Sequence, residues 1–357
     1  MTNAQLDTPV LILGGGVAGL AAAVDLGRRG VAATLIEREP RLGGRASGFC
    51  CKATEACARC GACRLGELLA QAAKLPQLSI YTAALAVATQ PRGEGWLVEL
   101  APQPGGEAGP GPGRPLEERT TVAAQAVILA VGAEAFDPAG KTRFGHGRVD
   151  GVFSALELEA MLAQGALGPQ ALAPAKVAFI QCVGSRDASL GRLWCSRVCC
   201  GYALRMARVI RGLLPESEIT FFHMDVQDYG RAWESELAEL RQDMRFVRAM
   251  PGEVTAGPEG PLVNYALAGE PPLREGFDLV VLSVGLGPPA GATALGELFG
   301  AGVDGDGFLA SQDGPAGVFV AGAAAGPRSL NESIVHGSLA ASWAAGRVAA
   351  LAEARHG

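Results

Sequence analysis

The amino-acid sequence predicts an α/β protein in which two units of parallel β-strands alternate with α-helices. Short apolar runs at residues 10–13, 176–180 and 218–222 have the composition of strands that are buried on both faces. The first run is followed by an alanine-rich helix to about Arg29 and then by a second strand at residues 32–36. This alternation is typical of a parallel sheet covered by helices.

A glycine loop joins the first predicted strand to the first predicted helix. It reads Gly14-Gly-Gly16-Val-Ala-Gly19, and the next strand ends at Glu37. Such glycines permit a tight turn and bring the backbone close to a pyrophosphate, which the helix N-terminus attracts, while the acid accepts from ribose hydroxyls. Strand, loop, helix and acid together predict a Rossmann-like dinucleotide-binding domain.

Three further segments favour FAD over NAD as the dinucleotide. Arg41-Leu-Gly-Gly-Arg45 follows the acid, and residues 126–132 and 317–322 resemble the middle and C-terminal motifs of two-dinucleotide-binding-domain flavoproteins. Ala323 stands where such proteins usually have an aspartate near the ribityl chain, so that contact is expected to be absent or supplied otherwise. The predicted FAD-contacting residues are Gly14, Gly16, Val17, Ala18, Gly19, Glu37, Arg38, Gly43, Gly44, Arg45, Ala130, Gly132, Gly322 and Ala323. The alternative is a Rossmann domain that binds NAD or no nucleotide.

The middle of the chain predicts a second α/β unit, with a helix from Trp194 to about Leu214 and a closing strand at residues 278–285. In thioredoxin-reductase-like enzymes an inserted domain of this kind binds NAD(P)H through its own glycine fingerprint. Here the loop after its first strand reads Gln181-Cys182-Val-Gly-Ser instead. We therefore expect two Rossmann-like dinucleotide-binding domains of the thioredoxin reductase type, the second without its nucleotide. The expected FAD-binding domain is residues 1–150 plus 286–357, and the expected inserted domain is residues 151–285.

Four cysteines of the predicted inserted domain, Cys182, Cys195, Cys199 and Cys200, have the spacing Cys-x12-Cys-x3-Cys-Cys. A structural zinc site usually has two Cys-x2–4-Cys knuckles, whereas an iron–sulfur cubane is held by four thiolates. Cys195 and Cys199 are expected to share one face of the predicted helix. The pattern predicts a [4Fe–4S] cluster, and buried core cysteines are the alternative.

A second cysteine group, Cys50, Cys51, Cys57, Cys60 and Cys63, follows Arg45. Its Cys-x2-Cys-x2-Cys run has ferredoxin-type spacing and needs a fourth ligand, which Cys51, Cys50 or a partner protein could supply. The sequence therefore favours a second cluster on Cys51, Cys57, Cys60 and Cys63. A redox dithiol of Cys57 and Cys60, an uncommitted thiol group and a zinc site remain alternatives.

Residues 179–186, the cysteine quartet and residues 321–328 carry a resemblance to a known family. The chain resembles HdrA, the iron–sulfur flavoprotein component of heterodisulfide reductase, in particular the short HdrA-like form of bacteria. The resemblance implies a flavoprotein with a cubane beside the isoalloxazine, often a homodimer, within a heterodisulfide-reductase-like (HdrABC-like) or quinone-interacting complex. It also implies a position near flavin N5 for Arg205, where the methanogen form has a lysine.

The composition agrees with a redox subunit. A formal net charge of −6 without a basic stripe argues against nucleic-acid binding, and no apolar run reaches the length of a membrane span. Unevenly clustered cysteines indicate metal ligation in a reducing cytoplasm more than disulfides.

We therefore expect an oxidoreductase subunit that converts between two-electron flavin chemistry and one-electron cluster chemistry in sulfur or thiol/disulfide metabolism. An NAD(P)H-dependent disulfide or ferredoxin reductase using Cys57 and Cys60 is the competing enzyme, and a flavin-bearing assembly scaffold is the competing non-enzyme.

Overall fold

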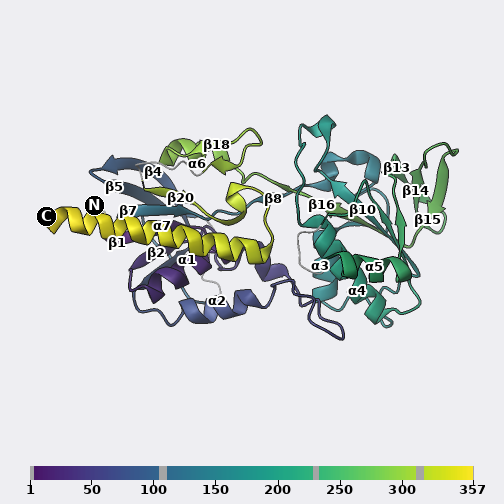
Figure 1. The fold of residues 1–357 in the computed structure, drawn as a ribbon, viewed down its shortest axis with the longest axis horizontal. Coiled ribbons are helices and arrows are strands. Elements are labelled where there is room, and N and C mark those ends of the chain that lie inside the picture. The colour runs from purple at the N-terminus through teal and green to yellow at the C-terminus, as the bar shows by residue number, and fades with distance from the viewer. Residues whose placement is uncertain (1–3, 104–110, 228–232, 311–316, 357) are drawn as a thin grey trace. The chain divides into compact units, whose positions relative to one another are not determined.

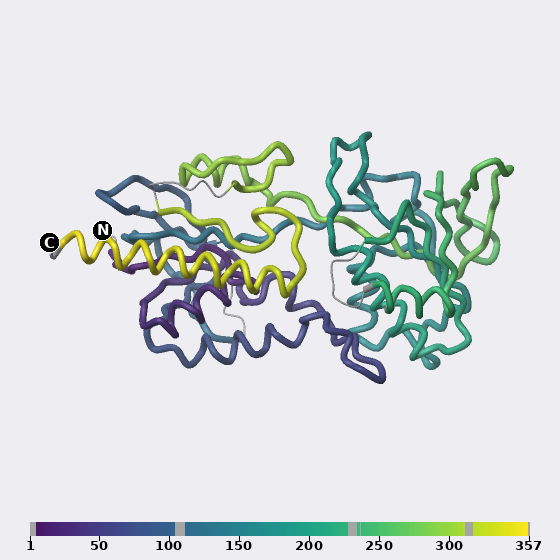
Figure 2. Tube along the Cα trace, viewed as in Figure 1, coloured from purple at the N-terminus to yellow at the C-terminus, as the bar shows by residue number. Residues whose placement is uncertain are grey.

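The computed structural model describes residues 4–103, 111–227, 233–310 and 317–356. The chain divides into two compact units, and Figures 1 and 2 show it leaving the first unit and later returning to it. Unit 1 consists of Met1–Ser47, Gly61–Glu134 and Pro288–Gly357, and unit 2 of Gly48–Cys60 and Ala135–Gly287. The assignment of residues 1–150 plus 286–357 to an FAD-binding domain, and of residues 151–285 to an inserted domain, stays a prediction.

Unit 1 is built on a sheet with β1 (Ala4–Leu13) between β7 (Thr120–Leu129) and β2 (Ala33–Ile36), which both run parallel to it. The strand order is β4-β5-β7-β1-β2-β3-β6, and β20 also pairs with β7. The other strands are β3 (Leu78–Thr82), β4 (Ala84–Arg92), β5 (Gly95–Pro102), β6 (Arg114–Pro115) and β20 (Val318–Val320).

The helices of unit 1 include α1 and α7, which pack closely together (Figure 1). A Cβ on Gly337 of α7 would lie 2.1 Å from the carbonyl oxygen of Ala18 in α1, so only glycine permits this approach. The elements are α1 (Val17–Arg28), α2 (Arg64–Ala72), α6 (Ala292–Phe299), α7 (Leu330–His356), and the short strands β18 (Gly302–Val303) and β19 (Leu309–Ala310).

Unit 2 has a parallel sheet of order β12-β11-β10-β16-β9. An antiparallel sheet of β13, β14 and β15 belongs to the same unit. The parallel strands are β9 (Val152–Ser154), β10 (Lys176–Val183), β11 (Glu218–Phe222), β12 (Arg245–Val247) and β16 (Leu279–Val284). The other elements are α3 (Ala155–Ala163), α4 (Cys199–Leu213), α5 (Trp233–Asp243), β13 (Glu253–Gly257), β14 (Gly260–Tyr265) and β15 (Leu273–Gly276).

Short strands and 3₁₀ helices lie between these elements. The strands β8 (Glu134–Ala135) and β17 (Leu286–Gly287) pair with each other. The 3₁₀ helices are η1 (Gly44–Gly48), η2 (Pro138–Gly140), η3 (Thr142–Phe144), η4 (Ala188–Leu190) and η5 (Gly322–Ala325).

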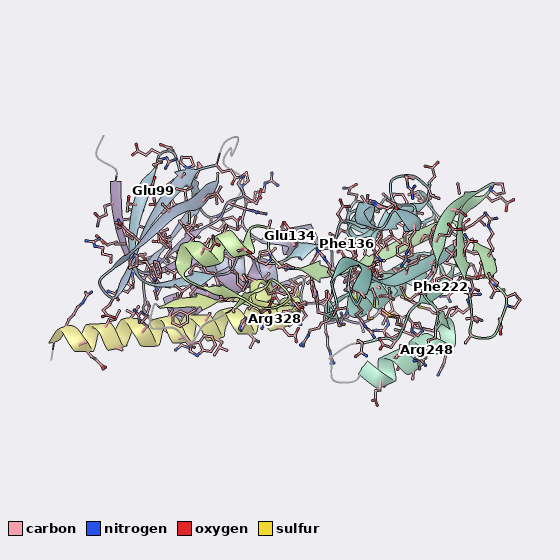
Figure 3. All side chains as sticks on the ribbon, turned by 90° about the horizontal axis from the view of Figure 1, so that it is seen from above. Glu99, Glu134, Phe136, Phe222, Arg248 and Arg328 are labelled. Atoms are coloured by element: carbon pink, nitrogen blue, oxygen red, sulfur yellow. The ribbon has the colours of Figure 1, made fainter. Side chains whose placement is uncertain are left out.

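Both faces of the unit 2 sheet are buried, as the continuous apolar runs predict. Phe179 and Phe221 stack with ring centroids 4.9 Å apart and belong to the cluster that contains the buried face of α4. Ile180 and Phe222, the next residues along these strands, belong to the opposite cluster (Phe222 is labelled in Figure 3). Alternation along each strand therefore divides the core into two layers.

One predicted boundary is wrong. The helix expected from Trp194 begins at Cys199, so Cys195 does not lie on it and does not share a helical face with Cys199. Arg197 has φ +61°, which interrupts a right-handed helix, and the Trp194 indole donates to the Leu286 carbonyl at 2.8 Å. No helix in the described ranges is long and apolar enough to cross a membrane.

Candidate functional site

Two glycines of the first loop in unit 1 are required by the protein's own packing. Gly14 has φ +107°, and a Cβ there would lie 2.4 Å from the Ala130 carbonyl oxygen. A Cβ on Gly19 would lie 1.9 Å from the carbonyl oxygen of Gly14. Both glycines therefore allow β1, β7 and the start of α1 to approach one another.

Gly16 is different, because no contact with the described residues requires a glycine there. Its φ is −73°, and no atom of the described chain lies within 4 Å of the position that its Cβ would take. Gly16 is also the N-cap of α1, and no side chain caps this helix end. An uncapped helix N-terminus beside open space is what a phosphate group needs, so the loop fits the pyrophosphate of a dinucleotide.

The second glycine segment of the prediction lies against this loop. The Gly43 amide donates to the Gly15 carbonyl at 2.8 Å, and a Cβ on Gly44 would lie 3.3 Å from the Gly16 Cα. The Arg45 guanidinium donates to the Ala133 carbonyl. Arg38, in contrast, is exposed and pairs with the neighbouring Glu39 at 3.2 Å. The structure therefore brings Gly43 and Gly44 to the predicted FAD loop and turns Arg38 toward solvent.

Glu37 is buried at the end of β2. Its Oε2 accepts from the Gly15 amide at 2.6 Å, and its Oε1 accepts from the Glu39 amide at 2.9 Å. Burial raises the pKa of Glu37 above its ordinary value, and these two backbone hydrogen bonds counteract the rise. Each carboxylate oxygen keeps a further lone pair, so Glu37 can also accept from a ribose hydroxyl.

The C-terminal segment of the prediction also reaches α1. Gly322 has φ +66°, and a Cβ there would lie 2.6 Å from the Ala18 Cβ. The Gly322 amide donates to His336 Nδ1 at 3.0 Å, and Arg328 donates to the Gly322 carbonyl at 3.0 Å (Arg328 is labelled in Figure 3). Ala323 follows in η5. Arg328 and His336 were not predicted site residues, because no local pattern shows that they support Gly322.

Val17, Ala18 and Gly132 lie at the carboxyl edge of the unit 1 sheet. Val17 and Ala18 open α1, directly after the uncapped Gly16. Gly132 follows β7 with φ +78°, and no atom in the described ranges lies within 4 Å of its Cβ position. Like Gly16, Gly132 therefore leaves open space at this edge.

In unit 2, Cys182 lies near the end of β10, where the strand register is irregular. Its φ is +57° and its side chain is buried. The Arg186 amide donates to the Trp194 carbonyl at 3.0 Å, and the Arg186 guanidinium forms two hydrogen bonds with Asp225. These contacts fold the segment after β10 back so that it presents Cys195 near Cys182.

The four cysteines of the predicted cluster lie together. The Cys199 thiol is hydrogen-bonded to the thiols of Cys182 and Cys200, and Cys195 is close enough to both to interact electrostatically. The hydrogen bonds with Cys199 lower the pKa of Cys182 and of Cys200, and they raise the pKa of Cys199. Burial raises the pKa of Cys195. All nine cysteines of the chain are free thiols.

The start of α4 fits an anionic cluster. Cys199 and Cys200 are its first two residues, and the preceding Val198 provides no side-chain cap, so the amide groups of this end can donate to sulfur. Within the described residues, no three His, Cys, Asp or Glu side chains have the spacing of ligands to one metal ion. A [4Fe–4S] cluster requires four thiolates, and the quartet supplies that donor set beside an uncapped helix end. Its assignment as the cluster ligands stays a prediction.

Backbone strain is concentrated in the two cysteine segments. Five described residues other than glycine have a left-handed backbone, namely Arg59, Ala83, Cys182, Arg186 and Arg197. Four of them lie next to or within the cysteine groups. The Arg197 amide donates to Cys195 Sγ at 3.3 Å, and the Arg59 amide donates to Cys57 Sγ at 3.4 Å. Each cysteine segment thus has a strained turn in which a backbone amide donates to a cysteine sulfur. Such a hydrogen bond stabilises a thiolate.

The second cysteine group is divided between the units. Cys51, Cys57 and Cys60 belong to unit 2, whereas Cys63 precedes α2 in unit 1. Burial and the nearby Glu159 raise the pKa of Cys50. The second cluster on Cys51, Cys57, Cys60 and Cys63 stays a prediction.

Two contacts hold residues 48–60 within unit 2. Lys52 and Glu159 form an ion pair in which both side chains are buried, and Glu159 also accepts from the Cys50 amide at 2.7 Å. Arg205 of α4 donates through Nε to the Ala58 carbonyl at 2.9 Å. In unit 2, Arg205 thus supports the turn that contains Cys57, and its predicted position near the flavin stays a prediction.

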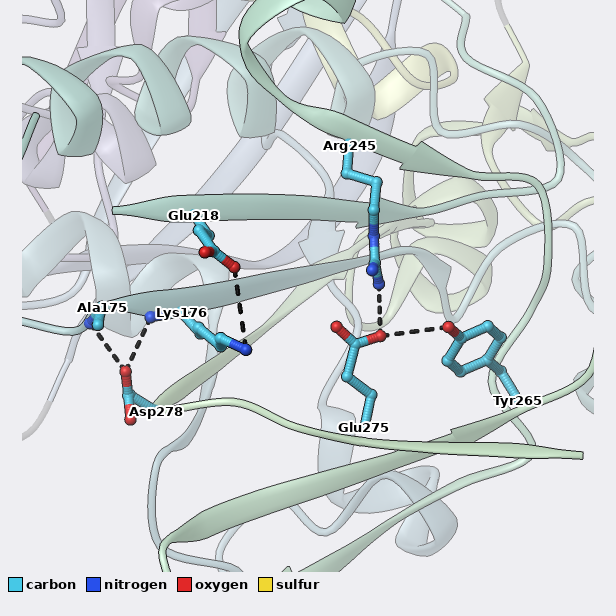
Figure 4. A network of polar contacts seen from close by, with 7 residues as sticks. All are labelled: Ala175, Lys176, Glu218, Arg245, Tyr265, Glu275 and Asp278. Carbon is cyan, nitrogen blue, oxygen red and sulfur yellow. Dashed lines mark hydrogen bonds and ion pairs between the residues drawn. The ribbon is translucent and has the colours of Figure 1, made fainter. Parts of the chain in front are cut away.

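A cavity of about 230 Å³ lies elsewhere in unit 2, at the amino end of the parallel sheet. Its charged lining is largely paired (Figure 4). Lys176 Nζ lies 3.9 Å from Glu218 Oε2. The Glu275 carboxylate pairs with the Arg245 guanidinium and accepts from the Tyr265 hydroxyl. Ligands of open α/β sheets bind at the carboxyl end instead, so we assign no function to this cavity.

Comparison with known proteins identifies the relatives of this chain. Residues 12–51 match the family model of an NAD(P)-binding Rossmann-like domain. The second HdrA-type iron–sulfur component of the CoB–CoM heterodisulfide reductase of Methanopyrus kandleri is 30% identical over 95% of this chain and 64% of its own length. The HdrA component of the H₂:CoB-CoM heterodisulfide, ferredoxin reductase of Methanothermobacter marburgensis is 36% identical over 61% of this chain and 36% of its own length.

Over 95% or more of its length, the chain is similar in sequence to HdrA, the iron–sulfur component of heterodisulfide reductase. It spans from about a third to about two thirds of the length of these relatives. The thioredoxin reductases of Lactococcus lactis and Thermoplasma acidophilum have the same fold, with a TM-score of 0.61 for each. The first enzyme is 17% identical, and the match covers 96% of this chain and 99% of that enzyme. The second is 16% identical, and the match covers 95% of this chain and 97% of that enzyme. The predicted fold, two Rossmann-like domains of the thioredoxin reductase type, is therefore confirmed.

Proposed function

We propose that this chain is a flavoprotein subunit that exchanges electrons between FAD in unit 1 and a [4Fe–4S] cluster on Cys182, Cys195, Cys199 and Cys200 in unit 2. One observation carries the proposal: four thiols lie together at the carboxyl end of the unit 2 sheet. The loop that follows β10 at this end has no glycine fingerprint for a nucleotide. FAD takes up two electrons together and releases them singly, whereas a cubane carries one.

The residues of the chain would bind and orient these groups. The open helix end at Gly16 and the buried Glu37 would hold the pyrophosphate and a ribose. The uncapped start of α4 and the amide of Arg197 would stabilise the thiolates and the charge of the cluster.

The partners would be other subunits of a heterodisulfide-reductase-like complex. The relatives are themselves named as subunits of heterodisulfide and ferredoxin reductases, and this supports a role between thiol/disulfide and ferredoxin-like carriers. A quinone-interacting complex and a homodimer remain part of the hypothesis.

Anaerobic purification tests the proposal. We expect about one FAD per chain, released on denaturation, with about four iron atoms and four sulfides for the predicted cluster. Protein that contains FAD without iron or sulfide would contradict the cluster, and recovery of NAD or FMN would contradict the FAD assignment.

Stopped-flow mixing with NADH or NADPH separates this function from that of an NAD(P)H-dependent disulfide or ferredoxin reductase. Hydride transfer requires a nicotinamide oriented against the flavin. The end of β10 presents Cys182 where the nucleotide loop would begin, so we expect no rapid bleaching of the flavin band. Rapid stoichiometric bleaching would favour the pyridine-nucleotide reductase that uses Cys57 and Cys60.

A further inference from the structure

Among the described residues, three buried polar side chains at the carboxyl end of the unit 2 sheet have no hydrogen-bond partner. Gln181, Ser185 and Ser283 are 1%, 1% and 0% exposed. Neither amide atom of Gln181, and neither serine hydroxyl, has a hydrogen-bond partner among the described residues. Because buried polar groups are nearly always hydrogen-bonded, these three require a bound group or ordered water.

Gln181 and Ser283 lie side by side on the sheet face that α4 covers. In β10 and β16, Phe179 and Val281 belong to the core cluster that contains the buried residues of α4. Gln181 and Ser283 are each two residues farther along, so they extend the same face toward the carboxyl end. The parallel register, with Ile180 opposite Leu282, places Gln181 next to Ser283.

The start of α4 lies at this same edge. The Tyr202 hydroxyl, in the first turn of the helix, donates to the Val284 carbonyl at 2.8 Å. Tyr202 follows Cys199 and Cys200, and Val284 follows Ser283 directly. Two cluster cysteines and the two unpartnered side chains therefore share the edge where β10 and β16 end.

Ser185 reaches this edge from the segment after Cys182. A Cβ on Gly285 would lie 3.0 Å from the Ser185 hydroxyl and 2.4 Å from the Ser196 hydroxyl, so both serines meet at Gly285. Ser196, next to Cys195, is satisfied because it accepts from the Leu286 amide at 2.8 Å. Ser185 has no such partner among the described residues and is left between the two cysteine segments.

We propose that Gln181, Ser185 and Ser283 donate hydrogen bonds to the sulfur atoms of the cluster and thereby raise its reduction potential. The inference rests on the proposed function, because it assumes the cluster on the four cysteines. Gln181 can donate through Nε2 and each serine through its hydroxyl, whereas cluster sulfurs can only accept. The reduced cluster carries one more negative charge, so these donors stabilise it more than the oxidised cluster.

The test is a redox titration, monitored by electron paramagnetic resonance, of the holoprotein and of Gln181→Leu, Ser185→Ala and Ser283→Ala. For each lost donor we expect the ratio of reduced to oxidised cluster at a fixed potential to fall about tenfold, a shift of about 59 mV for a one-electron couple. Ser217→Ala is the matched control. Ser217 is a buried serine of the same unit, but its hydroxyl already donates to the Leu214 carbonyl at 2.8 Å. The control should leave the potential unchanged.

A second measurement uses the unaltered protein and therefore does not depend on the folding of a variant. Pulsed electron paramagnetic resonance before and after transfer to D₂O should detect exchangeable protons coupled to the reduced cluster. Their absence would overturn the inference. Couplings that persist in all three variants, with an unchanged potential, would show that water satisfies these side chains and would also overturn it. A protein without any cluster signal would contradict the proposed function instead.

Discussion

The two units differ at the loop that joins a central parallel strand, β1 or β10, to the helix after it. In unit 1, the loop between β1 and α1 is short, and Gly16 leaves open space at an uncapped helix end. In unit 2, the connection between β10 and α4 is long and strained, and it presents thiols at an equally uncapped helix end. Both loops lie at the carboxyl end of a parallel sheet, where such folds bind their ligands.

This difference shows how one architecture can serve two kinds of cofactor. A helix N-terminus attracts any anion, so the loop residues decide which anion can approach. Glycines without side chains leave room for phosphate, whereas Cys182, Cys199 and Cys200 occupy that room and offer sulfur ligands. Changing one loop at a time should therefore affect one cofactor at a time.

The largest effect is expected from Cys199→Ser. Cys199 contacts both Cys182 and Cys200, so its loss should abolish or strongly perturb the cluster signal while FAD stays bound in unit 1. Iron content, electron paramagnetic resonance and flavin absorption measure the two sites separately. Cys50→Ser is the matched control, because Cys50 is a cysteine of the same unit that is not among the four proposed ligands. An unchanged cluster signal in Cys199→Ser would contradict the ligand assignment.

Gly16→Ser should change FAD affinity and the stability of the apoprotein in opposite directions. Gly16 has the extended backbone of an N-cap, and a serine there can cap α1, which should stabilise the apoprotein by a few tenths of a kcal/mol. The same side chain would fill the open space expected for phosphate. FAD should then bind on the order of a hundredfold more weakly, because charge-assisted hydrogen bonds of about 1.5–3 kcal/mol each are lost.

Calorimetry of the apoprotein and FAD titration measure the two effects of Gly16→Ser. Gly19→Ser is the contrasting variant, because its Cβ would lie 1.9 Å from the Gly14 carbonyl oxygen and should unfold the loop even without FAD. Full FAD affinity in folded Gly16→Ser would show that phosphate does not bind at this helix end.

Glu37→Gln should weaken FAD binding about tenfold, since a charged acceptor contributes about 1.4 kcal/mol more than a neutral one. The pH dependence follows from the raised pKa of the wild-type carboxyl, whose ordinary value is 4.5. Above its folded-state pKa, ionised Glu37 accepts hydrogen bonds from FAD but its burial destabilises the apoprotein. As the pH falls through that pKa, the destabilisation disappears and FAD affinity decreases.

Fluorescence titration of FAD from neutral pH toward pH 4.5, with wild type and Glu37→Gln side by side, measures this dependence. The two proteins should converge at the acidic end, because protonated Glu37 and glutamine are then equally uncharged. Parallel curves over the whole range would show that Glu37 does not bind the ribose.

The sequence predicts most of the fold and the cysteine quartet, because these depend on local patterns. The glycine fingerprint and the apolar strands at residues 10–13 and 176–180 are each contained in a short segment. The predicted start of α4 is too early because the left-handed backbone of Arg197 has no sequence signature in a non-glycine residue.

Other features depend on contacts between distant segments. The pairing of Lys52 with Glu159 and the support of Gly322 by Arg328 and His336 bring together residues that no local pattern connects. The sequence also does not show that Gln181 has no hydrogen-bond partner among the described residues. That depends on which groups of the neighbouring strands lie near its side chain.

The smallest effect is expected from Arg205→Met, which keeps an apolar stem but removes the hydrogen bond to the Ala58 carbonyl. That bond should contribute about 1 kcal/mol, so the global stability should change little. Residues 54–60 should exchange their amide hydrogens several-fold faster, because the turn that contains Cys57 loses its support from α4. Arg208→Met, on the same helix and 4.0 Å from Glu239, is the matched control and should leave that exchange unchanged. Redox titration of the flavin completes the test. If Arg205 lies near flavin N5, its removal should shift the flavin potential, because a fixed positive charge is lost. If Arg205 only supports the turn that contains Cys57, the flavin potential should stay unchanged.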